Sequence, residues 1–164
     1  MTQIPADDPN TRLWLRHTLA TLAYRAGKTV RGTPAAFGDY RADAKSPRVS
    51  EILAHMGDLM DWILTMMRGA PKWNNSTPLA WDDEVARFFD TVKRFDDYLA
   101  SDAPLGSEPE RLFQGAIADA LTHVGQLAML RRLAGCPIKG ENYYQADIVA
   151  GRVGSEQAAA RREF

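Results

Sequence analysis

The sequence predicts an all-α protein, a single domain over residues 1–164 folded as a four-helix bundle with an irregular C-terminal tail. Apolar residues recur at helical spacing in four stretches, and residues that cap or end helices bound each stretch. No alternating run of β-branched residues reaches the length of a strand, and no repeat of fixed period occurs. With 164 residues, 45% of them hydrophobic, the chain suits one domain with one core.

The first helix is expected over Thr11–Ala26, with Asn10 as its cap and Gly27 as its end. Its apolar residues cover nearly the whole circumference: Trp14, Leu15, Leu19, Leu22, Ala23 and Tyr24. A helix that is hydrophobic all round is buried on more than one side. We therefore expect a homodimer with this helix in its interface; burial by the C-terminal tail is the competing explanation.

The second helix is expected over Pro47–Arg68, with Ser46 as its cap and Pro47 at the first position, where a missing amide hydrogen costs nothing. This is the most apolar window of the chain. His55, Asp58 and Asp61 interrupt it before it reaches the roughly 20 residues that a membrane span needs. It is therefore expected to be a core helix.

The third helix is expected over Asp82–Ala100, with Asp82 as its cap. Its inward stripe consists of Val85, Phe88, Phe89, Val92, Phe95 and Leu99. The fourth helix is expected over Ser107–Ala134, where Ser107 and Glu110 have the spacing of a capping box and Gly135 ends the helix.

The tail, residues 136–164, is too polar for a further core helix. It is expected to wrap the bundle or a partner, anchored by Tyr143, Tyr144, Ile148 and Val149.

Net charge, cysteine content and the N-terminal segment limit the expected partners, disulfides and location of the protein. The net charge is −1 and the pI is near 6.3, so no basic surface is expected to attract nucleic acid or an anionic membrane. The single cysteine, Cys136, excludes an internal disulfide. The segment MTQIPADDPN is acidic and polar where a secretory signal is basic and then apolar, which predicts a cytoplasmic protein.

A metal site is the sharpest functional hypothesis. Asp119 and His123 stand four residues apart, so they share one helix face and can close on one ion. His55 of the second helix can supply a third ligand. On helical wheels all three lie at the border between core and solvent. Two histidines and one carboxylate leave coordination positions open, which suits a catalytic metal better than a structural one.

Simpler interpretations of the same residues stay open. Asp119 and His123 also fit an ordinary i, i+4 ion pair. Asp58, one turn from His55, is a candidate for fixing the imidazole tautomer, whereas Asp61 points away and is expected to be solvated. His17 fits either a site role or a hydrogen-bonded interior or interface position.

The order of these elements, with LAHMGDLMDW in the second helix and HVGQLAMLRRLAG in the fourth, resembles the DinB/YfiT-like superfamily of metalloenzymes. The likeness extends to about Gly135, and its most specific part is the HVGQL stretch at His123, which is similar to the family's HxGQL signature. By this resemblance the fold is a four-helix bundle with a long crossover, often dimeric. The family's site has three histidines, of which His55 matches the first and His123 the last.

Asp119 stands where the resemblance places the middle histidine. A carboxylate there shifts preference toward harder ions, so Fe, Mn or Ni join Zn as candidates, or the exchange marks a relative that has lost its metal. Characterised members of the family include transferases and isomerases that depend on low-molecular-weight thiols.

Two classes of function follow from the sequence. The first is a metal-dependent enzyme, possessing one divalent ion and acting on a small-molecule substrate, with a low-molecular-weight thiol as a partner. Its groove is expected to be rimmed by aromatic and basic side chains: Trp62, Trp73, Trp81, Arg131 and Arg132. The competing role for the tryptophans is packing. The second class is a non-catalytic, dimeric stress-response or binding protein.

Overall fold

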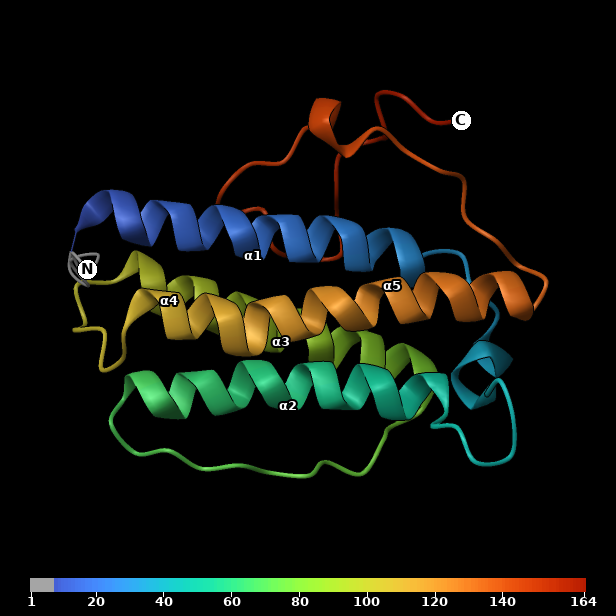
Figure 1. The fold of residues 1–164 in the computed structure, drawn as a ribbon, viewed down its shortest axis with the longest axis horizontal. Helices are drawn as coiled ribbons and strands as arrows, with labels where there is room; N and C mark the ends of the chain where they lie inside the picture. Colours follow the sequence, from blue (N-terminus) through green and yellow to red (C-terminus); the bar gives the residue numbers. More distant parts are fainter. Residues whose placement is uncertain (1–7) are drawn as a thin grey trace.

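The computed structural model describes residues 8–164, which are all-α and contain no β-strand (Figure 1). The long helices are α1 (Pro9–Val30), α2 (Val49–Met67), α3 (Trp81–Ala100) and a last helical run made of α4 (Pro109–Leu112), η2 (Phe113–Ile117) and α5 (Ala118–Leu133). Two short 3-10 helices complete the fold, η1 (Ala35–Asp39) and η3 (Tyr143–Gln145). The predicted all-α class is confirmed.

The long helices lie side by side and enclose one core (Figure 1). Both α1 and α2 contact α3 on one side and α5 on the other. The core contains fully buried side chains from every long element, among them Leu15, Leu19, Leu53, Met56, Phe88, Phe95, Leu112 and Ile117. This arrangement places α2 beside α5, which are the two helices that carry the predicted metal ligands.

The first helix is longer than predicted at both ends. Asp8, not Asn10, is its cap, and the Asp8 carboxylate accepts a hydrogen bond from the Asn10 amide at 3.0 Å. Gly27 does not end α1, which continues to Val30. Glycine costs about 1 kcal/mol inside a helix, and burial of Val30 in the core offsets that cost.

The predicted caps of the other helices are also wrong. Arg48, not Ser46, precedes α2, and its backbone amide donates to the Glu51 carboxylate at 2.6 Å. Helix α3 begins at Trp81, so Asp82 lies inside its first turn. The last run begins at Pro109 after Glu108, so Ser107 is not a cap. In each case the start lies one or two residues from the predicted one, a difference that spacing alone does not resolve.

The last helical run is interrupted, contrary to the unbroken helix predicted over Ser107–Ala134. Residues Phe113–Ile117 form a π-helical turn between α4 and α5. A π turn holds more residues than an α turn, so it changes the face on which the following residues lie. Asp119 and His123 follow directly after it.

The residues after α5 pack along α1 (Figure 1). Glu141 is buried and accepts hydrogen bonds from the Tyr24 hydroxyl and from Lys28 Nζ, the latter at 2.7 Å. Burial and the hydrogen bond to Glu141 raise the pKa of Tyr24. Tyr143 contacts the Tyr24 ring edge-on, with 6.3 Å between ring centroids, and Val153 is buried.

Two of the four predicted anchors of this segment are wrong, because Tyr144 is 98% exposed and Val149 is exposed as well. Tyr143 and Ile148 do contact the folded chain. Of the apolar α1 residues that suggested a dimer, five are buried within the chain: Leu15, Leu19, Leu22, Ala23 and Tyr24. Trp14 remains half exposed. The C-terminal segment thus covers the Tyr24 side of α1, as the competing explanation proposed.

Among residues 8–164, no helix is long and apolar enough to cross a membrane. Residues 1–7 lie outside the described part of the chain, and with them most of the N-terminal segment from which a cytoplasmic location was predicted.

Candidate metal centre

Three side chains from two neighbouring helices, α2 and α5, converge. His55 comes from α2, and Asp119 and His123 come from α5. The Asp119 carboxylate lies between the two imidazoles, with Oδ2 3.7 Å from His55 Nε2 and Oδ1 3.4 Å from His123 Nε2. One ligand atom from each of the three residues lies within 4.8 Å of the other two. The structure thus brings together all three predicted ligands in a group that could hold a metal ion.

The spacing of these atoms fits a divalent ion. An ion bound at about 2.0–2.2 Å by nitrogen and oxygen ligands in a tetrahedral arrangement separates those ligands by roughly 3.4 Å. The distances from the two Asp119 oxygens, one to each histidine, are close to that value, and with one atom taken from each residue the three atoms lie within 4.8 Å of one another. The two imidazoles lie edge to face, with 5.0 Å between their centroids.

The group is partly open to solvent. The exposed fractions of the side chains are 38% for His55, 46% for Asp119 and 19% for His123, which confirms the border positions expected from the helical wheels. Structural zinc sites are closed by four protein ligands, whereas catalytic sites keep a position for water or substrate. Three ligands with this exposure match the second type.

Gln126 supplies a hydrogen bond that the sequence interpretation missed. Its amide oxygen lies 2.8 Å from Nδ1 of His123. Because an amide oxygen can only accept, this contact requires a proton on Nδ1; in the neutral imidazole the lone pair is then on Nε2, the nitrogen that lies 3.4 Å from Asp119. Partners of this kind orient the imidazoles of metal sites. The signal was the i, i+3 spacing of His123 and Gln126 within HVGQL.

Of the two carboxylates near His55, Asp58 does not act as predicted, whereas Asp61 lies outside the candidate centre and is partly exposed. Asp58 is buried and accepts hydrogen bonds from the Ser76 amide and hydroxyl, so it anchors the connection between α2 and α3 and does not orient the His55 ring. Asp61 pairs with Arg94 at 2.7 Å. His17 is exposed on α1 and is not part of the candidate centre, which excludes the interior position that was considered for it.

Two of the four tryptophans border the candidate centre. Trp73 packs on the His55 ring with 5.7 Å between centroids, and Trp62 contacts Trp73. The predicted roles of Trp81 and Arg131 at this rim are wrong. Trp81 is buried and donates a hydrogen bond to Thr33. Arg131 is buried and donates to carbonyl groups at the end of α1.

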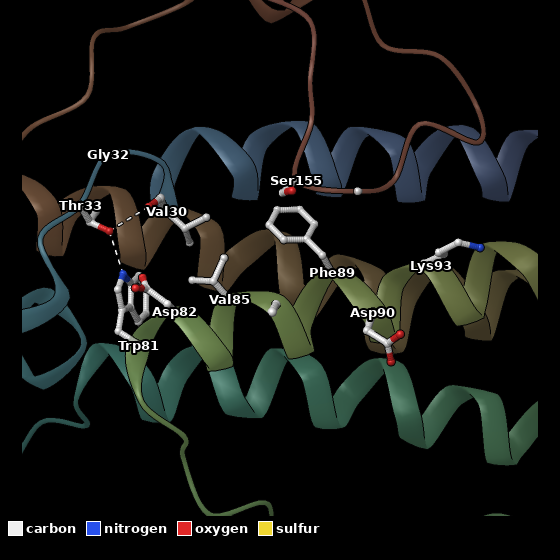
Figure 2. A pocket seen from close by; sticks show the side chains of 12 residues that line it. Val30, Gly32, Thr33, Trp81, Asp82, Val85, Phe89, Asp90, Lys93 and Ser155 are labelled. Carbon is white, nitrogen blue, oxygen red and sulfur yellow. Dashed lines mark hydrogen bonds between the residues drawn. The ribbon is translucent and has the colours of Figure 1, made fainter.

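Trp81 instead lines a separate cavity of about 570 Å³ between the end of α1, α3 and the C-terminal segment (Figure 2). Val30, Val85 and Phe89 form its apolar part, and Asp82, Asp90 and Lys93 lie along α3 (Figure 2). No member of the candidate metal centre lines this cavity.

Comparison of the chain with models of known protein families, with curated proteins and with solved structures finds no match. Membership of the DinB/YfiT-like superfamily therefore stays a prediction.

Proposed function

We propose that this protein is a metal-dependent enzyme of the DinB/YfiT-like type, which binds one divalent ion through His55, Asp119 and His123 and acts on a small molecule. The observation that carries the proposal is the convergence of three ligand atoms within 4.8 Å on a half-exposed face. The hydrogen bond from His123 to Gln126 adds support, because it presents Nε2 of His123 as a ligand.

The ligand set points to a class of chemistry. Two imidazoles and a carboxylate suit Zn, Ni, Fe or Mn, and the carboxylate favours the harder ions of that group. A divalent ion held there supplies activation of a thiol or a water molecule as a nucleophile at neutral pH. A transferase or isomerase that uses a low-molecular-weight thiol fits this chemistry and the family resemblance.

One observation favours a different function, that of a non-catalytic binding protein that has lost or never used the metal. Asp119 lies within 4 Å of both histidines, which is also the geometry of two ion pairs when the imidazoles are protonated. Metal content separates the two functions.

The test is elemental analysis of protein purified without an affinity tag, followed by titration of the metal-free protein with Co(II). We expect one ion per chain in the wild type and at least about tenfold weaker binding in His123→Ala. His17→Ala is the matched control, because His17 is an exposed histidine outside the centre. Equal metal content in the wild type and in the double variant His55→Ala, His123→Ala would contradict the proposal.

A further inference from the structure

We propose that Trp73 is a substrate-contacting residue, and that the substrate joins an anionic metal-binding group to a planar aromatic ring. This inference rests on the proposed metal site and names the class of molecule that the site accepts. It is carried by the position of Trp73 next to a metal ligand and by the contacts that hold it there.

Four rings form a continuous row that leads away from the candidate centre. The distance between ring centroids is 5.0 Å from His123 to His55 and 5.7 Å from His55 to Trp73. From Trp73 to Trp62 it is 6.0 Å. Trp62 is seven residues after His55 and so lies two turns along the same face of α2. The Trp73 indole therefore extends the site along α2, beginning at a ligand.

The surface of Trp73 is available to a ligand. Its side chain lies in the connection between α2 and α3, which runs back along α2, and it is 41% exposed (Figure 1). A tryptophan that served only to fill the core would be buried, as Trp81 is. Aromatic rings prefer tilted or offset contacts with other rings, and the exposed part of the indole can make such a contact with a substrate.

The connection is fixed to α2 on both sides of Trp73. Before it, the Lys72 amide donates to the Thr65 hydroxyl at 2.9 Å. After it, the Ser76 amide donates at 2.9 Å to Asp58, a carboxylate that is only 4% exposed.

The indole itself is held by a hydrogen bond from Nε1 to the Asn75 side chain at 2.9 Å. A side chain held in place before binding loses little freedom when a ligand arrives, which favours affinity and selectivity. Trp73 is therefore placed as a fixed wall of the site.

The net charge of the metal-bound centre determines which metal-binding group the substrate should carry. Two neutral imidazoles, one carboxylate and a divalent ion sum to one net positive charge. Such a centre favours a singly anionic group at its open positions, such as a thiolate or a hydroxamate. With Trp73 beside it, the preferred ligand has an aromatic ring within a few bonds of that group.

Three hydroxamates that share one metal-binding group and differ in the attached group test the inference. Benzohydroxamate carries a phenyl ring, cyclohexanecarbohydroxamate carries a saturated ring, and acetohydroxamate carries a methyl group. Their dissociation constants are measured on Co(II)-loaded protein from the visible absorption of the metal. We expect the wild type to bind the phenyl compound roughly tenfold more tightly than the methyl compound, with the cyclohexyl compound between them.

Variants at the tryptophans provide the controls. In Trp73→Ala the preference for phenyl over methyl should fall to about twofold or less, while Co(II) binding is unchanged, because Trp73 is not a ligand. Trp73→Phe should keep most of the preference. Trp14→Ala removes another exposed tryptophan, which packs on Phe113 and not on the candidate centre, and its preference for phenyl over methyl should equal that of the wild type.

Each contrary outcome overturns a defined claim. If the wild type binds the phenyl and cyclohexyl compounds with equal affinity, the site does not select a substrate with an aromatic ring. An unchanged preference in Trp73→Ala excludes Trp73 as the contact. A wild-type chain that takes up no Co(II) refutes the proposed function itself, and the inference with it.

Discussion

At the scale of single residues, the candidate centre depends on contacts that orient its ligands as well as on the ligands themselves. Gln126 is exposed and makes no contribution to the core, yet its amide oxygen fixes the proton of His123 on Nδ1. Without that hydrogen bond, the His123 imidazole can adopt the other tautomer or rotate away from the orientation that binds an ion.

The first prediction is therefore that Gln126→Leu weakens metal binding by about 10-fold, the lower end of the range for such outer contacts. The measurement is Co(II) titration of the metal-free protein. Gln126→Glu keeps an acceptor at the same place and should retain most of the affinity. The unfolding temperature of the metal-free protein should be nearly the same in the wild type, Gln126→Leu and Gln126→Glu. Different unfolding temperatures with equal metal affinities would show that Gln126 stabilises the fold and does not orient His123.

At the scale of elements, Lys28 joins α1 to the C-terminal segment. Its ammonium group pairs with Glu141 at 2.7 Å and with Glu163 at 3.0 Å, and the Glu141 side chain is fully buried. Removing one partner of a buried pair leaves the other charge without compensation, at a cost of about 3 kcal/mol. The segment from Glu141 to Gly154 is thus expected to be held on α1 by this cluster.

The second prediction is that amides of residues 141–154 are protected from exchange in the wild type and that Lys28→Met accelerates their exchange. Fast exchange throughout the segment in the wild type would show that it is not docked. Lys45→Met is a suitable control, because Lys45 is exposed in the connection between η1 and α2 and is not part of the cluster formed by Lys28.

The same cluster implies a dependence on pH. The hydrogen bond from Lys28 lowers the pKa of Glu163 below its usual value. A carboxyl group with a lowered pKa in the folded state stabilises the fold above its unfolded pKa of about 4.3, and this contribution disappears as the pH falls through the folded pKa. The difference in unfolding free energy between the wild type and Lys28→Met should therefore be larger at pH 7 than at pH 3.

The third prediction concerns Gly27, a glycine inside α1. A Cβ at this position would lie 3.5 Å from Cγ of Gln157, an ordinary contact, so alanine fits. Gly27→Ala should stabilise the protein by about 0.5–1 kcal/mol, measured by denaturant unfolding, because alanine favours the helix. Gly106→Ala is the matched comparison and should destabilise, since its Cβ would overlap the carbonyl oxygen of Met67. Destabilisation by Gly27→Ala would mean that α1 is more tightly packed there.

At the scale of the whole molecule, the question is what covers the exposed part of α1. Leu15 is fully buried within the chain, so charging it would disrupt the core and would not test a dimer. Leu13 and Trp14 are exposed at 55% and 52% near the start of α1, and they are the apolar residues of this helix that a second copy could cover.

The fourth prediction is a homodimer through this end of α1, seen in light scattering as twice the 18.2 kDa of one chain. In a twofold interface each residue occurs twice, so Trp14→Glu should shift the protein toward monomer. Leu79→Glu, at an exposed apolar residue in the connection before α3, should leave the mass unchanged. A wild-type mass near that of one chain at micromolar concentration would rule the dimer out.

Helical periodicity and the residues that punctuate it were enough to predict an all-α chain, the four helical stretches, and the helices on which His55, Asp119 and His123 lie. These properties are local, because spacing along the chain fixes which residues share a helix face. The border positions of the three ligands followed from the same geometry.

The tertiary structure decided which neighbours those residues meet. The helix caps are Asp8 and Arg48 in place of Asn10 and Ser46, and Gly27 is part of α1, because packing between helices outweighs differences of about 1 kcal/mol in local preference. Asp58 reaches Ser76 and Trp81 reaches Thr33 through contacts between segments far apart in the sequence. Spacing cannot specify such contacts, since they depend on how whole helices are placed against each other.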